Sequence, residues 1–578
     1  MSFNKFPSVK VTTATPCLVG WAEINQEFSN QIRSRKINTV VIECYQGVYI
    51  EKLKNTIAAS FAEAEIIDAA VAWKEEAGIR ALTHASVTDD RIFGFMTNLN
   101  LSDLFDASKV QQIKESLLTV NKLTFVIGTG ASLLVSNPGL VIYADMARWE
   151  IQLRMRRKEV ANVGLSNFTD SFETQYKRGF FLDWRLCDNL KKQLLPRCHY
   201  ILDTNNWNEP KLITYDMLNA GLTQTVQQPF SVVPFFDPGP WGGQWMKEKF
   251  NLDKSTSNFA WCFNCVPEEN SLLLDFNGIK FETPSINLVL FKPLELLGKK
   301  NQEQFGDEFP IRFDFLDTIE GGNLSLQVHP LPDYIKKHFG MKYTQDESYY
   351  ILDATEDALV YLGLKENVNG NEMIEDLRKA QSDGSTFDAD KYAQRWPAKK
   401  HDHFLIPAGT VHCSAAGCMV LEISATPYIF TFKLWDWGRL GLDGKPRPIN
   451  IEHGANVIQW DRQPAWTKQN LINRFEAVSG GAGWKEEKTG LHELEFIETR
   501  RYRQTEKVTH HTNGDVNVLM IVDGKQAVVE CPHNTFEAFV VNYAEAFVIP
   551  AQIKEYTIRP YGPSQGEEIV VIKAFVRH

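Results

Sequence analysis

Four side chains that can hold a metal ion constrain this chain more than any other feature. Gln327 and His329 stand one residue apart in the run Leu-Ser-Leu-Gln-Val-His-Pro at 324–330. Side chains alternate faces along a strand, so these two leave on the same side while Val328 points away into apolar packing. We expect Gln327 and His329 to be two ligands of one site.

Two more ligands are expected from two further strands. Glu347 lies in the segment 345–352, which is predicted to be a second strand, and His412 follows a Gly turn just after a third strand that ends near Ile406. Taken singly, each of the four residues is more often a structural polar group. Together, two imidazoles, a carboxylate and an amide oxygen suit a divalent ion, zinc first, with a position left open for water or substrate. Other divalent ions accept similar sets.

Several short motifs around these residues occur in a fixed order. They are Gly-Pro-Trp-Gly-Gly at 239–243, Gln-Val-His-Pro at 327–330, the Glu347 segment, Pro-Ala-Gly-Thr-Val-His at 407–412, Leu-Glu-Ile at 421–423, Trp-Asp-Trp-Gly-Arg at 435–439 and Asp-Gly-Lys-Pro-Arg at 443–447. With them, the C-terminal three-fifths of the chain, from about residue 235, resembles the type I phosphomannose isomerases. These are cupin-like zinc enzymes that interconvert mannose 6-phosphate and fructose 6-phosphate.

The resemblance implies a set of site residues. Gln327, His329, Glu347 and His412 would hold Zn²⁺, and charged groups after Glu422 would face the substrate. The expected catalytic residues are Lys433 and Arg439, and the expected substrate-binding residues are Ser325, Trp241, Lys445 and Arg447. A sugar phosphate needs such cations or N–H groups. Each of these residues could instead be an ordinary surface cation or strand hydroxyl.

Three positions depart from the family pattern. Asp314 stands where the family commonly has Lys, Gln345 replaces a Lys two residues before the glutamate ligand, and Lys433 is the nearest substitute for an Arg. Lys carries charge but lacks the fixed fork of Arg. The ligand set and the ordered motifs nevertheless predict a metal-dependent aldose–ketose isomerase acting on mannose 6-phosphate. The alternative is a catalytically weakened sugar- or nucleotide-binding protein with a regulatory or assembly role, and a bifunctional kinase–isomerase is a third reading.

The N-terminal two-fifths has a different character. Buried strands are predicted at 38–44, 123–127 and 140–145, a helix at 49–64 and an Arg-rich helix from about Arg148 to Arg157. Alternating strands and helices favour a parallel α/β sheet. The order of pieces resembles P-loop kinases of the uridine-kinase type. The phosphate loop is degenerate, because the run from Glu43 to Tyr49 has one glycine, no Lys and an acidic residue.

The predicted organisation is therefore multidomain. We expect an α/β P-loop-like domain at 1–230, a metal-binding cupin domain at 231–364 and 401–470 with a helical insertion at 365–400, and a second cupin-like β domain at 471–578. In the last of these, Asp523-Gly524 predicts a hairpin, and His510 and His511 are expected at the surface.

The charge and the apolar content of the chain argue against nucleic-acid and membrane partners. A net charge of −11 and the lack of a basic stripe argue against nucleic-acid binding. With no apolar stretch of membrane-spanning or signal-peptide length, we expect a cytoplasmic protein with no membrane partner. The nine cysteines are scattered and are expected to be buried thiols. The expected partner is a small sugar phosphate, and the oligomeric state is left open.

Overall fold

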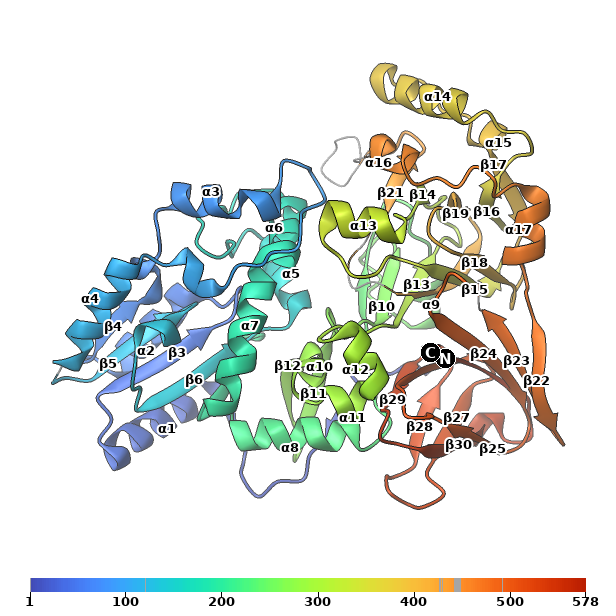
Figure 1. Cartoon of the computed structure of the whole chain (residues 1–578). Helices are drawn as coiled ribbons and strands as arrows, with labels where there is room; N and C mark the ends of the chain where they lie inside the picture. The colour runs from blue at the N-terminus through green and yellow to red at the C-terminus, as the bar shows by residue number, and fades with distance from the viewer. Residues whose placement is uncertain (1, 120, 426–427, 429, 441–448, 491) are drawn as a thin grey trace. The chain divides into compact units, whose positions relative to one another are not determined.

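The computed structural model describes residues 2–119, 121–425, 428, 430–440, 449–490 and 492–578 (Figure 1). The chain is multidomain and forms two compact units. The α/β unit contains Ser8–Gln224 and Ser271–Phe291, and the β unit contains Met1–Pro7, Thr225–Asn270 and Lys292–His578. The predicted boundary near residue 230 lies close to the break at Gln224. The segment 271–291 joins the α/β unit from within the predicted metal-binding domain, because its strands pair there.

A seven-stranded sheet in the order β2-β8-β7-β6-β3-β5-β4 forms the centre of the α/β unit. Five strands run parallel: β3 (Thr39–Cys44), β4 (Glu65–Asp68), β5 (Thr124–Gly128), β6 (Leu140–Asp145) and β7 (Tyr200–Asp203). Antiparallel β8 (Lys211–Thr214) and β2 (Leu18–Val19) complete one edge. The predicted strands at 38–44, 123–127 and 140–145 agree with β3, β5 and β6 to within one residue. Their apolar residues are buried, as a parallel sheet covered by helices requires.

The helices of this unit alternate with the strands of the sheet along the chain (Figure 1). They include α1 (Gly20–Arg35), α2 (Ile50–Ser60), α3 (Glu76–Val87), α4 (Ala107–Leu118), α5 (Arg148–Arg156), α6 (Phe172–Arg178), α7 (Trp184–Leu194) and most of α8 (Tyr215–Val226). A small sheet is made by β1 (Ser8–Lys10), β11 (Ser271–Phe276) and β12 (Ile279–Pro284), followed by α10 (Ile286–Phe291). The predicted helices at 49–64 and around Arg148–Arg157 correspond to α2 and α5.

Two sheets form the first half of the β unit. The six-stranded sheet has the order β18-β15-β20-β13-β10-β9, with bounds His403–Ile406, Glu347–Ala354, Cys418–Ser424, Arg312–Asp317, Trp261–Cys265 and Phe235–Asp237. The five-stranded sheet has the order β17-β16-β19-β14-β21, with bounds Ala393–Pro397, Leu359–Leu364, His412–Ser414, Leu326–Val328 and Phe432–Trp435.

The β unit also contains eight α-helices within its described residues. They are α9 (Trp245–Lys249), α11 (Pro293–Leu297), α12 (Lys299–Phe305), α13 (Pro332–Phe339), α14 (Gly370–Asp383), α15 (Ala389–Tyr392), α16 (Ile451–Ala455) and α17 (Pro464–Leu471). The predicted helical insertion at 365–400 thus contains α14 and α15, but it ends in strand β17. That strand pairs with β16. Pairing within the sheet therefore makes the end of the segment a strand, although its polar composition predicted a helix.

The second half of the β unit also contains two sheets. The order β22-β23-β24-β31-β26-β29 joins strands Glu476–Gly481, Trp484–Gly490, Ile497–Gln504, Ile569–Val576, Asn517–Asp523 and Ala546–Ile549. The order β25-β30-β27-β28 joins Val508–His511, Glu555–Pro560, Gln526–Glu530 and Phe539–Asn542. An apolar cluster that includes Leu519, Val529, Phe547 and Ile558 contains residues from both sheets.

Two predictions for this region are wrong. The turn at Asp523-Gly524 exists, with Gly524 at φ 89°, but β26 and β27 on its two sides pair in different sheets rather than as a hairpin. His511 is exposed, whereas His510 is only 2 % exposed. His510 points inward because alternation along β25 puts every second residue in the core, where its ring stacks on Tyr556.

Within the described residues, no helix combines the length and the apolar character needed to cross a membrane. The cysteines are all free and buried, as expected for thiols that act as small apolar side chains.

Candidate metal centre

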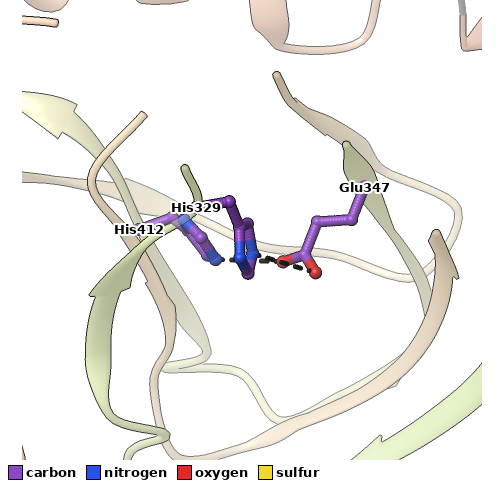
Figure 2. Close-up of side chains that lie close together, drawn as sticks. All are labelled: His329, Glu347 and His412. Atoms are coloured by element: carbon purple, nitrogen blue, oxygen red, sulfur yellow. Dashed lines mark ion pairs between the residues drawn. The ribbon is translucent and has the colours of Figure 1, made fainter. Parts of the chain in front are cut away.

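Ligand side chains from both sheets of the first half of the β unit meet at one point. His329 follows β14, His412 begins β19, and Glu347 begins β15 of the other sheet. One ligand atom from each lies within 4.8 Å of the others, and all three residues are buried. Figure 2 shows the two imidazoles and the carboxylate pointing toward one another. The two sheets therefore face each other around this cluster.

The distances among the ligand atoms are short. His329 Nε2 lies 3.1 Å from Glu347 Oε2, and His412 Nε2 lies 2.9 Å from Glu347 Oε1. Gln327 is paired with His412 across β14 and β19, and its amide lies 3.0 Å from His412 Nε2. A flip of that amide exchanges its nitrogen for an oxygen, which is a metal ligand. The structure thus brings together the four predicted ligands.

The outer nitrogens of both histidines are held by backbone carbonyls. His329 Nδ1 lies 2.8 Å from Phe430 O, and His412 Nδ1 lies 2.8 Å from Thr410 O. A carbonyl accepts only, so each Nδ1 carries the proton and each Nε2 presents a lone pair to the centre. Among the described residues, His329 Nε2 and Glu347 Oε1 have no hydrogen-bond partner. Buried atoms that converge without hydrogen bonds fit a divalent ion, zinc first.

Electrostatics within the cluster are strongly coupled. Burial opposes ionisation, but the two imidazoles hold the pKa of Glu347 well below its usual range. Burial likewise favours neutral histidine, yet the Glu347 carboxylate raises the pKa of His329. Burial dominates at His412 and lowers its pKa. The site therefore holds an ionised carboxylate beside its two imidazoles.

Gln345 acts beside these ligands rather than as a proton carrier. Its Nε2 donates to Glu347 Oε2 at 3.0 Å, and its Oε1 accepts from the backbone N–H of Phe430 at 2.9 Å. Because Phe430 O also holds His329, this amide links the surroundings of two ligands. The sequence comparison identified Gln345 only as a lost lysine and missed this orienting role.

Lys433 lies in the same row of residues as two of the predicted ligands. Gln327 pairs with His412 on one side and with Lys433 of β21 on the other. Residues directly opposite each other on antiparallel strands project from the same face of the sheet. Lys433 therefore projects from the metal-ligand face of the five-stranded sheet, half-buried.

The facing six-stranded sheet contributes an acidic row. Asp314, Glu422 and Tyr349 lie side by side on β13, β20 and β15. Burial raises the pKa of Asp314 to about 6, and burial together with Glu347 and Asp314 raises that of Glu422 well above its usual range. Arg312 shares the face of Asp314 and pairs with it at 2.8 Å. Sequence reasoning missed Arg312, although its spacing of two from Asp314 on a strand could have identified it.

Asp436 binds the side chains of two residues that were predicted to contact substrate or take part in catalysis. Sequence reasoning had not singled out Asp436. The Ser325 hydroxyl donates to Asp436 Oδ1 at 2.8 Å, and Arg439 Nη2 lies 2.7 Å from the same oxygen. Trp241 is buried against Trp261 and serves as packing in this structure. Lys445 and Arg447 lie outside the described residues.

In the predicted phosphate loop of the α/β unit, an acidic side chain binds backbone N–H groups of another segment. The Glu43 carboxylate, at the end of β3, accepts the backbone N–H groups of Gly130 at 2.6 Å and Ser132 at 2.8 Å. Burial raises the pKa of Glu43 to about 7. A Cβ on Gly47 would lie 2.8 Å from Ile151 of α5, so that helix packs directly on the loop. An internal carboxylate thus takes backbone donors of the kind that bind phosphate.

A family model matches the N-terminal part of the chain, and relatives match about two-fifths of the chain. Residues 20–227 match a family model described as a domain of unknown function (DUF8485). The chain is 28% identical over 247 residues to mannose-6-phosphate isomerase of Streptococcus mutans, covering 41% of this chain and 72% of that protein. It is 25% identical over 233 residues to mannose-6-phosphate isomerase ManA of Bacillus subtilis, covering 40% and 68%.

A solved structure is also similar to part of this chain. The crystal structure of mannose 6-phosphate isomerase from Bacillus subtilis matches with a TM-score of 0.48 and 18% identity, covering 60% of this chain and 99% of that one. The sequence similarity supports a sugar isomerase in the β unit, and the buried cluster is compatible with a divalent metal. The α/β unit matches a family without an assigned function.

Proposed function

We propose that the β unit is a metal-dependent aldose–ketose isomerase that interconverts mannose 6-phosphate and fructose 6-phosphate. The observation that carries the proposal is the convergence of the buried His329, Glu347 and His412. The curated relatives are named mannose-6-phosphate isomerases, and this similarity suggests the substrate.

The donor set defines what the site can do. Gln327, His329, Glu347 and His412 would hold the ion. A bound divalent ion polarises the carbonyl and neighbouring hydroxyl oxygens of a sugar, which makes the proton at the adjacent carbon acidic. A backbone carbonyl keeps each imidazole in the tautomer that presents Nε2, so the ligands are preorganised.

Lys433 is the group that we assign to proton transfer. Isomerisation moves a proton between C1 and C2, and this requires a base and an acid near the two carbons. The register of Lys433 beside Gln327 puts it on the ligand face. A lysine in partly desolvated surroundings can release its proton and act as the base. Burial raises the pKa of Glu422 on the opposite sheet well above its usual range. In its protonated form, Glu422 can donate a hydrogen bond to a sugar hydroxyl.

The remaining predicted residues would orient the substrate. Ser325 and Arg439 are fixed by Asp436, and we assign them, with Lys445 and Arg447, to the phosphate end of the sugar. Asp314 opposes a phosphate by charge, and its pairing with Arg312 moderates that effect. Turnover slower than that of an isomerase with a cation at position 314 follows from this arrangement.

A second candidate function has its own supporting observation. Glu43 of the degenerate loop occupies the backbone N–H groups of Gly130 and Ser132, which favours an α/β unit that binds partners or supports folding instead of transferring phosphate. In that case the protein would bind sugars in a regulatory or assembly role. The β unit would then convert mannose 6-phosphate slowly or not at all.

The experiment that separates the two is isomerase turnover by the full chain loaded with zinc. Mannose 6-phosphate is supplied, and fructose 6-phosphate is measured, for the wild type and for His412→Ala. Turnover by the wild type and its loss in the variant are expected. A wild type that binds one ion per chain but produces no fructose 6-phosphate would contradict the isomerase proposal and favour the sensing role.

A further inference from the structure

One short turn contacts the surroundings of all three metal-binding residues. We name residues 407–410 the ligand turn. The N–H of Gly409 donates to His329 O at 3.0 Å, and the Thr410 carbonyl accepts from His412 Nδ1 at 2.8 Å. The N–H of Ala408 donates to Asp346 Oδ1 at 2.7 Å, and Asp346 directly precedes Glu347. The position of the ligand turn therefore sets the relative positions of His329, Glu347 and His412.

The ligand turn is pressed against the segment that follows α16. Gly409 has φ 86°, and a Cβ there would lie 2.7 Å from Gln459 Cγ and 2.9 Å from Val457 O. The N–H of Gln459 donates to Gly409 O at 2.9 Å. Only glycine fits this close approach, and these contacts fix the position of the ligand turn against the segment.

Arg462, in the same segment, holds the outward side of the ligand turn. Its Nη1 donates to Pro407 O and Ala408 O, each at 2.7 Å, and to the Thr410 hydroxyl. The side chain is buried, with the residue 5 % exposed. Its own carbonyl accepts from Leu364 N–H at 2.9 Å, which fixes the arginine to β16. The described contacts of Arg462 thus connect three groups of one turn to the sheet that carries His412.

We propose that Arg462 is a positioning residue of the metal centre, acting through the ligand turn to hold the three ligands at metal-binding distances. The inference rests on the proposed metal site. Arg462 contacts neither a ligand side chain nor the reacting atoms, so its effect is on metal affinity. Outer contacts of this kind are worth about 10- to 100-fold in metal affinity.

Lysine cannot fully replace arginine here. The guanidinium presents several donors in a fixed plane, whereas an ammonium is a compact charge on a flexible stem. Lysine would keep the charge and one contact to the turn. Arg462→Lys is therefore expected to bind metal more weakly than the wild type and more tightly than Arg462→Ala.

The test measures zinc affinity of the full chain by competition with a chromophoric chelator. The variants are Arg462→Ala, Arg462→Lys and Thr410→Val, which removes the hydroxyl that Arg462 contacts. Arg501→Ala is the matched control, because Arg501 is also buried, at 4 % exposure, and donates to a backbone carbonyl, His401 O, at 3.1 Å. Melting temperature is recorded for every variant.

The expected order of zinc affinity is wild type, then Thr410→Val and Arg462→Lys, then Arg462→Ala, with a loss of about 10- to 100-fold for the last. Arg501→Ala should lower the melting temperature and leave zinc affinity unchanged. Zinc affinity that is equal in the wild type and the Arg462 variants would overturn the inference while the metal site stands. If Arg462→Ala does not fold, wild-type affinity in Arg462→Lys and Thr410→Val would overturn it. A wild type that binds no zinc would overturn the metal site and the inference together.

Discussion

Gln327 and Lys433 lie directly opposite each other on β14 and β21, so their side chains leave the same face of the five-stranded sheet. His412 lies on the other side of Gln327 in the same row. The pairing puts Lys433, the residue predicted to substitute for an arginine, next to a predicted metal ligand. It links strand register to the proton-transfer chemistry proposed for the site.

The first prediction concerns Lys433. Lys433→Met keeps the apolar stem but removes the ammonium, so the kcat for mannose 6-phosphate should fall by about 100- to 10,000-fold, as expected for loss of a general base. Zinc content, measured by elemental analysis, should stay at one ion per chain. Unchanged kcat in Lys433→Met would show that the proton is moved by another group.

Asp314 should weaken the binding of a phosphorylated sugar. Asp314→Asn keeps an acceptor for Arg312 but removes the negative charge, and we expect the KM for mannose 6-phosphate to fall by about 10-fold, the scale of one charge-assisted interaction. Unphosphorylated mannose is the matched control and should show the same KM in both proteins. Equal KM values for mannose 6-phosphate would mean that the phosphate lies away from Asp314.

A buried histidine outside the metal site predicts how stability depends on pH. Burial lowers the pKa of His403 to about 3, and neither ring nitrogen has a hydrogen-bond partner within the described part of the chain. An unfolded histidine titrates near 6.5, so between pH 6.5 and 3 the unfolded state binds the additional proton and stability falls as pH falls. The slope from this residue is at most about 1.4 kcal/mol per pH unit.

His403→Phe removes that titration and keeps an aromatic ring against Tyr350. Urea unfolding at pH 7.5 and pH 5.5 should show a smaller loss of unfolding free energy in the variant than in the wild type. The same loss in both proteins would argue that His403 is protonated in the folded state or exposed.

Glu43 is predicted to be structural. Glu43→Ala leaves the buried N–H groups of Gly130 and Ser132 without their acceptor, which costs about 1–3 kcal/mol for each group left unsatisfied. Thermal unfolding should report a lower melting temperature, with kcat for mannose 6-phosphate unchanged. Gain of nucleotide binding in Glu43→Ala, measured by calorimetry with ATP, would instead show that the carboxylate blocks a working phosphate site.

Short-range sequence patterns indicated the four candidate ligands but not the residues that hold them in place. Gln327 and His329 could be paired from alternation on one strand, and Glu347 and His412 from their motifs. The contacts of Arg462 with the ligand turn could not be predicted, because they join residues more than 50 positions apart through backbone carbonyls, which leave no mark on the sequence.

The errors in the fold have a related cause. The turn at Asp523-Gly524 was predicted correctly as a turn. The local sequence does not show whether the strand after the turn, β27, pairs with the strand before it, β26. His510 was expected at the surface because no carboxylate stands at a spacing that would pair it as a metal ligand, whereas alternation along β25 points it into the core. Likewise, pairing of β1 with β11 draws 271–291 into the α/β unit, and no local signal encodes such a long-range pairing.

The most direct measurement is mannose 6-phosphate turnover by the full chain, recorded as zinc is titrated into metal-free protein. The account predicts that fructose 6-phosphate formation rises in proportion to bound zinc and levels off at one ion per chain. His412→Ala should need at least about 100-fold more zinc than the wild type to reach half of its maximal turnover. This loss is larger than that expected when a residue outside the ligand set is changed. Turnover that is independent of zinc, or zinc bound at one ion per chain without turnover, would contradict the metal-dependent isomerase.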